Sequence, residues 1–298
     1  LGKYDEAEPL FRRALEIRKA ALGEDHADTA ESINNLAGLL ETLGKYDEAE
    51  PLFRRALEMH KAALGEEHVD TAMDMNNLAN LLDTLGKYDE AEPLHRRALE
   101  IRKAALGEDH THTAESMNNL ASLLETLEKY DEAEPLYRRA LEIDKAALGE
   151  DHKDTATDMN NLASLLETLG KYDEAEPLFR RALEIRKAAL GEDHADTASS
   201  MNNLAGLLET LGKYDEAEPL FRRALEIRKA ALGEDHADTA ESINNLASLL
   251  ETLGKYDEAE PLFRRALEMH KAALGEEHVD TAMDMNNLAN LLDTLGKY

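Results

Sequence analysis

A repeat of 42 residues runs through the whole sequence and constrains its fold more than any other feature. The pair Asn34 and Asn35 recurs at this interval, together with segments such as KYDEAEPL and RRALE. A fixed period of this length is typical of repeat architectures, in which each unit buries its apolar face only against its neighbours. The 298 residues are therefore interpreted as a single array of seven repeats, residues 1–298, rather than as two ordinary domains.

Each repeat is predicted to contain two helices. The first one met along the chain begins near Asp5, which forms a capping-box-like signature with Glu8, and Pro9 falls near its first turn. It is expected to end at about Leu22, before Gly23 as a C-cap. Its apolar stripe consists of Ala7, Leu10, Phe11, Ala14, Leu15 and Ile17.

The other helix of the repeat is expected from about Ala27 to Thr42, and Leu43-Gly44 stops it. Its candidate N-caps are Asp25, His26 and Asp28. Its buried stripe is expected to contain Ala30, Ile33, Leu36, Ala37 and Leu40. One helical hairpin cannot bury both stripes, whereas stacked copies share a continuous core, so the sequence predicts an all-α fold of the α-solenoid type.

The segment AESINNLAGLLETLGKYDEAEPLFRRALEM, residues 30–59, resembles a tetratricopeptide repeat. The likeness is carried by small residues at Ala37, Ala49 and Ala56, by large residues at Leu36, Leu40 and Phe53, and by Gly44 at the turn. The extension RKAALGEDHADT, residues 18–29, lengthens the repeat to 42 residues, a form that resembles the repeats of kinesin light chain. The family's usual proline at the end of the second helix is absent.

This resemblance implies a right-handed superhelix of fourteen helices without a catalytic domain. It also implies a concave groove, lined by the first helix of each hairpin, that binds an extended peptide or a flexible partner segment of another protein. The alternative interpretation is a structural spacer or sensor array belonging to a larger protein. A binder should lose affinity when groove side chains are removed, whereas a spacer should show no saturable ligand.

The paired asparagines are the first candidate ligand-binding residues, because a carboxamide can both donate to and accept from a peptide backbone. They are Asn34, Asn35, Asn76, Asn77, Asn118, Asn119, Asn160, Asn161, Asn202, Asn203, Asn244, Asn245, Asn286 and Asn287. With the leucines of this helix pointing inward, the opposite face carries Ala27, Glu31, Asn34, Gly38 and Glu41. The alternative for Asn35 is a bond to the backbone of the adjacent hairpin that fixes the stacking geometry.

An acidic row is the second candidate part of the groove. It consists of Glu41, Asp83, Glu125, Glu167, Glu209, Glu251 and Asp293. Such a row favours a basic or polar peptide. Only Lys153 offers a positive charge at the edge of this face, so a clamp for an acidic C-terminus is not expected. The alternative for the acidic row is an ordinary solvated helix face, and harmless drift equally explains the variation at Glu31 and Gly38.

Composition excludes several classes of partner and chemistry. The formal net charge of −29 repels nucleic acid and anionic membrane surfaces. The absence of cysteine excludes disulfides and thiol catalysis and fits a reducing compartment, so a cytoplasmic location is expected. No apolar run is long enough to span a membrane.

Histidines recur once per repeat and invite a metal interpretation. They are His26, His68, His110, His152, His194, His236 and His278. Neighbouring copies are expected to lie one repeat apart, too far to share an ion, so they are interpreted as loop-packing or capping residues. His110 and His112 with Asp109 could chelate a metal weakly, but a surface loop is the preferred interpretation. No cofactor, metal or enzyme activity is predicted.

Three further histidines differ from this pattern. His95, like Tyr137, replaces the aromatic residue seen at Phe11 and is interpreted as a packing variant. His60 and His270 replace Arg18 and are expected on an exposed face. The chain begins with a second helix and finishes after a first helix, so both ends are expected to present apolar stripes. Because these faces are complementary, head-to-tail self-association is predicted.

Overall fold

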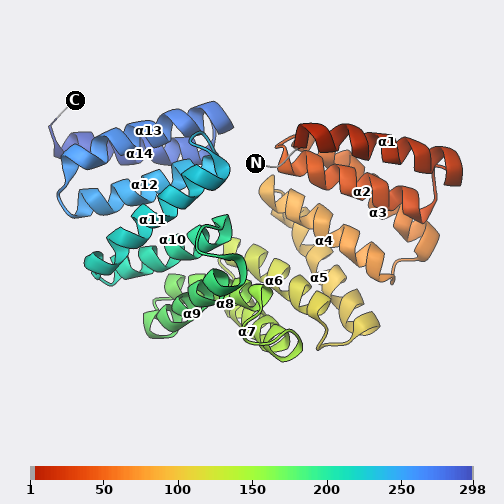
Figure 1. Cartoon of the computed structure of the whole chain (residues 1–298). Helices are drawn as coiled ribbons and strands as arrows, with labels where there is room; N and C mark the ends of the chain where they lie inside the picture. The colour runs from red at the N-terminus through yellow and green to blue at the C-terminus, as the bar shows by residue number, and fades with distance from the viewer. Residues whose placement is uncertain (1–3, 297–298) are drawn as a thin grey trace. The chain divides into compact units, whose positions relative to one another are not determined.

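The computed structural model describes residues 4–296, apart from the side chain of Asp5, and over this part every regular element is an α-helix (Figure 1). The helices are α1 Tyr4–Leu22, α2 Ala27–Thr42, α3 Tyr46–Leu64, α4 Val69–Thr84, α5 Tyr88–Leu106, α6 Thr111–Thr126, α7 Tyr130–Ala147, α8 Lys153–Thr168, α9 Tyr172–Leu190, α10 Ala195–Thr210, α11 Tyr214–Leu232, α12 Ala237–Thr252, α13 Tyr256–Leu274 and α14 Val279–Thr294. The even-numbered helices are the predicted first helices of the hairpins, and the odd-numbered ones are the second helices. The all-α solenoid prediction is confirmed.

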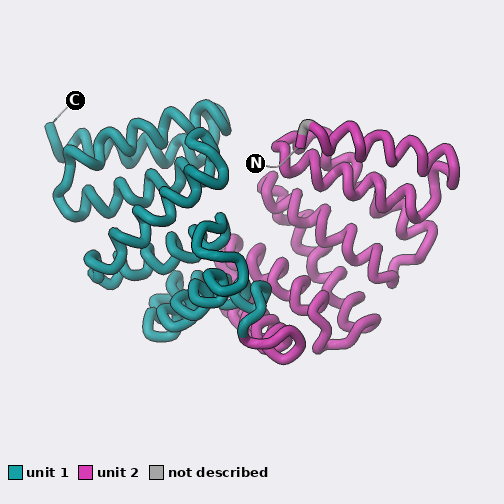
Figure 2. The backbone as a smooth tube through the Cα atoms, viewed as in Figure 1, with its two compact units in different colours: residues 1, 151–298 teal, residues 2–150 magenta. Residues whose placement is uncertain are grey.

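The chain divides into two compact units, residues 2–150 and residues 151–298 (Figure 2). In each unit, an even-numbered helix packs most extensively against the odd-numbered helix that follows it. Each even-numbered helix also contacts the next even-numbered helix of its unit, as α2 contacts α4. The surfaces of the even-numbered helices therefore lie side by side within a unit.

A tight glycine turn closes each hairpin. In the first complete one, Gly44 adopts φ +70°, and the amides of Gly44 and Lys45 donate to the carbonyls of Glu41 and Leu40 at 2.8 Å. These bonds satisfy carbonyl groups that a helix end leaves unpaired. The turn therefore sends the chain directly into α3, antiparallel to α2.

The start of the odd-numbered helices differs from the prediction. Lys45 is the N-cap of α3 and makes no side-chain capping bond, so the equivalent of Asp5 lies inside the first turn. The capping-box prediction is therefore wrong for the internal repeats, and the carboxyl group of Asp5 itself lies outside the described residues. Glu50, the equivalent of Glu8, instead accepts hydrogen bonds from Arg54 and from Lys87 of the next hairpin.

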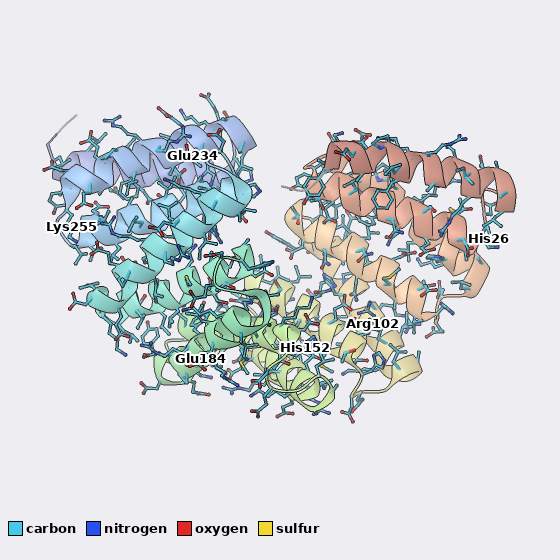
Figure 3. All side chains as sticks on the ribbon, viewed as in Figure 1. His26, Arg102, His152, Glu184, Glu234 and Lys255 are labelled. Carbon is cyan, nitrogen blue, oxygen red and sulfur yellow. The ribbon has the colours of Figure 1, made fainter. Side chains whose placement is uncertain are left out.

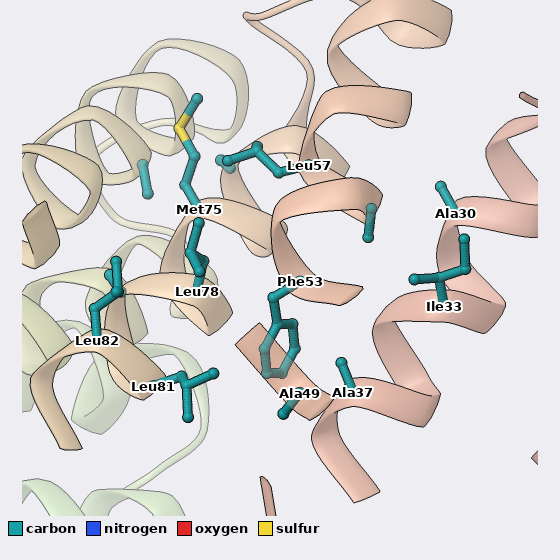
Figure 4. Close-up of a cluster of buried hydrophobic side chains, with 14 of the residues drawn as sticks. Ala30, Ile33, Ala37, Ala49, Phe53, Leu57, Met75, Leu78, Leu81 and Leu82 are labelled. Carbon is teal, nitrogen blue, oxygen red and sulfur yellow. The ribbon is translucent and has the colours of Figure 1, made fainter. Parts of the chain in front are cut away.

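The two apolar stripes meet in a core that continues from hairpin to hairpin. In the first unit this core includes Ile33 and Leu36 of α2, Phe53 of α3 and Leu82 of α4, all at most 2% exposed. Figure 4 shows the surroundings of Phe53. Alanines such as Ala37 and Ala49 are fully buried. Their small side chains let neighbouring helices approach closely. Full burial of a leucine, isoleucine or phenylalanine side chain stabilises the fold by about 1.5–3 kcal/mol.

The predicted stripe of α1 is only partly buried. Leu15 is 6% exposed, but Leu10 and Ile17 are 70% and 52% exposed. Their internal equivalents in α3, Leu52 and Met59, are half-buried and buried, because α2 packs against α3 there. No described helix is long and apolar enough to cross a membrane.

Candidate functional site

Each even-numbered helix carries one stripe of side chains that stay at least partly exposed. In α4 this stripe consists of Met73, Asn77, Asn80 and Thr84, spaced four, three and four residues apart. All of its members, in all seven even-numbered helices, are exposed or half-buried. We call it the exposed stripe. Because even-numbered helices lie side by side within a unit, their exposed stripes form a continuous, mostly polar surface.

The first asparagine of each pair does not belong to the exposed stripe. Asn34, Asn76, Asn160, Asn202 and Asn244 are between 1% and 5% exposed. Asn118 is half-buried and Asn286, in the last helix, is exposed. The predicted position of Asn34 on an open helix face is therefore wrong, because the next even-numbered helix covers it.

Hydrogen bonds explain why a polar side chain is tolerated there. Asn160 Nδ2 donates to Ser200 Oγ at 2.9 Å, and Asn202 Nδ2 donates to Ser242 Oγ at 2.7 Å. Asn76 makes the same bond to Ser116. A buried amide with a partner costs far less than one without. The first asparagines therefore join consecutive even-numbered helices.

The second asparagine of each pair belongs to the exposed stripe. Asn35 and Asn203 are exposed, and the other members are half-buried: Asn77, Asn119, Asn161, Asn245 and Asn287. The amides of Asn77 and Asn287 donate to the side-chain oxygens of Asn34 and Asn244, one hairpin earlier, at 3.3 and 3.2 Å. These partners are side chains rather than the backbone proposed in the alternative for Asn35.

The acidic row borders the exposed stripe at the C-terminal ends of the even-numbered helices. Glu41, Asp83, Glu125, Glu167, Glu209 and Glu251 are half-buried, and Asp293 is exposed. Removal from water raises the pKa of each of the six half-buried carboxyl groups. No cation in the described part of the chain opposes this shift, and a helix C-terminus also disfavours negative charge.

Two neighbours of the row do make contacts with it. The hydroxyl of Tyr137 donates to Glu125 Oε2 at 3.2 Å, and a hydrogen bond with Thr252 partly opposes the raised pKa of Glu209. Neither contact neutralises a charge. The acidic row is thus more than a solvated helix face, because its charges are partly desolvated.

The repeated histidines are the N-caps of the even-numbered helices. His26 Nδ1 accepts a hydrogen bond from the amide of Asp28 at 3.1 Å, and the copies in the other repeats do the same. Figure 3 labels His26 and His152, which lie at the turns before α2 and α8. The capping interpretation is confirmed, with His26 rather than Asp25 or Asp28 as the cap.

His110 and His112 lie close together at the start of α6, where His110 is half-buried and His112 is exposed. The rings of His110 and His112 lie 5.2 Å apart, and His112 Nδ1 lies 3.3 Å from Glu115 Oε2. Over residues 4–296, no three histidine or acidic side chains are arranged to hold a metal ion.

His60 and His270 are buried, so the prediction that they lie on an exposed face is wrong. Each is 3% exposed, and its Nδ1 faces a fully buried aspartate: His60 Nδ1 lies 2.5 Å from Asp74 Oδ2 and His270 Nδ1 lies 2.7 Å from Asp284 Oδ2. Burial alone lowers the pKa of His60, but the hydrogen bond and charge of Asp74 outweigh it, so the pKa of His60 is raised. Sequence reasoning missed these pairs. A signal was present, because in most repeats the residue at this position is arginine and the residue fourteen positions later is serine. In these two repeats both residues change together, to histidine and aspartate.

His95 is fully buried, which agrees with its interpretation as a packing variant. Its Nδ1 lies 3.1 Å from Asn76 Oδ1, and its Nε2 has no hydrogen-bond partner. Burial lowers the pKa of His95 to about 4. The imidazole is therefore neutral near pH 7 and occupies the place of a phenylalanine.

The family model described as "Tetratricopeptide repeat" matches the chain along its whole length. The overlapping matches cover residues 1–62, 32–104, 75–146, 113–188, 154–230, 196–272 and 238–298. The chain belongs to the tetratricopeptide repeat family. Proteins with this fold are generally scaffolds without enzymatic activity that bind peptides or other proteins.

Several solved structures share the fold. BtubC (BKLC) from P. vanneervenii is 27% identical, with a TM-score of 0.62 over 78% of this chain and 94% of its own. A putative kinesin light chain from Podosopora anserina with nearly identical repeats is 22% identical, with a TM-score of 0.57 over 70% of this chain and 99% of its own. The apo form of RapI is 16% identical, with a TM-score of 0.60 over 90% of this chain and 98% of its own.

The search of curated proteins gave no significant match. The family model and the solved structures confirm the predicted likeness to tetratricopeptide repeats of the kinesin-light-chain type.

Proposed function

We propose that the seven repeats form one array that binds an extended, basic or polar segment of a partner protein along its even-numbered helices. The observation that carries this proposal is the acidic row, whose six half-buried carboxyl groups have raised pKa values and no neutralising cation among the described residues. A cationic peptide in this place would supply the missing positive charge. The family match to residues 113–188, which runs across the boundary between the units, supports continuity of the array.

The second asparagines complete the proposed site. Asn119, Asn161 and Asn203 are exposed or half-buried on the stripe beside the acidic row, so their amides can reach a peptide backbone. The first asparagines are proposed to support the site indirectly, because their bonds to serines hold neighbouring even-numbered helices together. A cytoplasmic location remains a prediction.

The test uses a peptide array of matched basic, neutral and acidic extended sequences. Glu125→Gln with Glu167→Gln and Glu209→Gln is expected to weaken binding of basic peptides and to flatten its salt dependence, because exposed charges are screened over about 8 Å at physiological ionic strength. Asn161→Ala with Asn203→Ala is expected to weaken binding with little change in stability. The matched variant Asn160→Ala is expected to lower the unfolding free energy by about 1–3 kcal/mol, because it leaves Ser200 without its donor.

Equal affinity of the unsubstituted protein for basic and acidic peptides would contradict the proposal. The absence of any saturable ligand would favour the spacer interpretation instead.

A second candidate is head-to-tail self-association through α1 and α14. Leu10 and Ile17 of α1 are more than half exposed, and so is Val279 of α14. Exposed apolar side chains concentrated on two helices favour an interface, and the occupant proposed for each is the other helix of a second copy.

A further inference from the structure

One side-chain position near the end of each odd-numbered helix reaches between two even-numbered helices. In α11 this residue is Arg228, which is 5% exposed. Its Nη1 donates to the carbonyl oxygen of Asp238 and to Glu241 Oε2, each at 2.7 Å, and its Nη2 donates to Ser199 Oγ at 3.2 Å. The guanidinium group therefore lies between the N-terminal parts of α10 and α12.

The next repeat replaces this arginine by a shorter residue. His270 of α13 stands in its place and turns its Nδ1 to Asp284, which replaces a serine. A cavity of about 210 Å³ lies beside it, lined by Ala237, Asp238, Glu241, His270, Asp280 and Met283.

The cavity occupies the position that the guanidinium group fills one repeat earlier. Glu241, Asp280 and Met283 lie 42 residues after Ser199, Asp238 and Glu241, three of the four residues to which Arg228 donates hydrogen bonds. The cavity is several times the volume of one water molecule, about 30 Å³ in the liquid. Its shape therefore derives from the loss of an arginine side chain.

The charges around the cavity favour a cation. Three of its six lining residues, Asp238, Glu241 and Asp280, are acidic, and Asp284 lies behind the imidazole of His270. Arg228 neutralises only Glu241, and the N-terminal ends of α12 and α14 contribute about half a positive charge each.

The imidazoles of His236 and His278 lie 3.7 and 3.6 Å from the carboxyl groups of Asp238 and Asp280 and add positive charge only when protonated. The excess of carboxyl groups around the cavity disfavours an anion despite the two helix N-termini. A metal ion is also disfavoured, because no three ligating side chains converge within residues 4–296.

We propose that the cavity beside His270 binds the guanidinium group of an arginine side chain from a bound peptide. This proposal rests on the proposed function, since it names one residue of the basic segment. By analogy with the contacts of Arg228, the backbone carbonyl of Asp280 would accept from the guanidinium group. The carboxylate of Glu241, which Arg228 also contacts, would be a second acceptor, and Met283 offers an apolar contact to the methylene stem. The same residue types recur around His60, at Ala27, Asp28, Glu31, Asp70 and Met73, so an equivalent site is expected there.

The test uses the acetyl amide of arginine as a probe and the acetyl amide of citrulline as its uncharged match. In two-dimensional NMR titrations the arginine probe is expected to shift amides of residues 279–284 and 69–74 saturably, and the citrulline probe is not. A filled variant combines His60→Arg, Asp74→Ser, His270→Arg and Asp284→Ser, which restores the arginine and serine pair that α11 and α12 already use. It is expected to bind the arginine probe at least tenfold more weakly.

A second variant keeps the cavity but removes charge: Asp70→Asn with Asp280→Asn is expected to weaken the arginine probe severalfold. Three outcomes would contradict the proposed site: equal binding of both probes, unchanged binding in the filled variant, or saturable binding of inorganic phosphate at these residues. The two proposals fail separately. If the filled variant still binds basic peptides as tightly as the unsubstituted protein, only the cavity proposal fails; if the arginine probe binds but no peptide does, only the groove proposal fails.

Discussion

His95 shows how a single residue changes the response of one repeat to pH. Phenylalanine occupies the same position in α1, α3, α9, α11 and α13, where it needs no hydrogen bond. The imidazole of His95 is fully buried in the same surroundings, and its Nε2 is unpaired. A buried imidazole without an acidic partner resists protonation, which is why the pKa of His95 falls to about 4.

The pKa of His95 predicts an acid-sensitive repeat. Because the unfolded chain binds this proton near pH 6.5 and the folded protein only near pH 4, stability is fully present above pH 6.5 and is lost as the pH falls. Between pH 6.5 and pH 5 the loss is about 1.6 kcal/mol. His95→Phe is expected to remove this loss, measured by hydrogen exchange of amides in α4 and α5.

The stability that the pair of His60 and Asp74 contributes changes with pH in the opposite direction. The pair is present in both the unsubstituted protein and His95→Phe, so its contribution cancels when their pH profiles are compared. Phe179→Leu, at the equivalent position in α9, neither adds nor removes a titrating group, so it serves as the control and should leave the acid response unchanged. Identical pH profiles for the unsubstituted protein and His95→Phe would contradict the pKa shift.

The two asparagines of each pair mark the limit of what residue patterns predict. The leucines of α2 identify its buried side, but Asn34 and Asn35 are only about 100° apart around the helix. The position of the neighbouring even-numbered helix decides which of the two asparagines is covered. That position depends on packing between repeats, so the sequence pattern of one repeat does not predict it. The same limit explains why His60 and His270 were expected on the surface.

At the scale of the helix, the boundaries of the even-numbered helices were predictable because they have a local chemical cause. His26 begins α2 with a side-chain cap, and Gly44 follows its end with a positive φ. The fold followed from these signals and from the 42-residue period. Contacts between repeats, such as that of Asn160 with Ser200, were not predictable, because they join residues 40 positions apart.

One turn between helices departs from the glycine rule and yields a prediction. Glu128 adopts φ +57° at the position that is glycine in the other repeats. A residue with a Cβ in the left-handed region costs about 1–2 kcal/mol, partly offset because glycine makes the unfolded chain more flexible by about 0.4–1 kcal/mol. Glu128→Gly is therefore expected to raise the unfolding free energy of the hairpin of α6 and α7 by about 0.5–1 kcal/mol.

The measurement is hydrogen exchange of amides in α6 and α7, because opening of a repeat array need not be a single transition. Gly170→Glu, the reverse change in the hairpin of α8 and α9, should lower the local stability by a similar amount. A neutral or destabilising effect of Glu128→Gly would show that the glutamate side chain compensates for its backbone conformation.

At the scale of the whole molecule, the internal repeats show how α14 and α1 of two copies would fit together. α14 has the same sequence as α4, and α1 differs from α5 only in having Phe11 in place of His95. α4 packs against α5. Met75 of α4 is 4% exposed, whereas its equivalent in α14, Met285, is 37% exposed.

The same contrast holds for the partner helix, since Ile101 of α5 is 1% exposed and Ile17 of α1 is 52% exposed. Docking α14 of one molecule onto α1 of another would reproduce the packing of α4 on α5 and bury both side chains. Such a contact joins two different surfaces, so it repeats from molecule to molecule without closing.

This argument predicts that the mass measured by light scattering rises with protein concentration from the micromolar to the millimolar range. Ile17→Lys blocks the α1 face and Met285→Lys blocks the α14 face, so either variant alone should remain monomeric. A mixture of the two retains one usable face of each kind and should therefore form heterodimers and nothing larger. Asn290→Lys, on the exposed stripe of α14, is the matched control and should associate like the unsubstituted protein. A monomer at millimolar concentration would rule the interface out, and equal disruption by Asn290→Lys and Met285→Lys would place the contact elsewhere on α14.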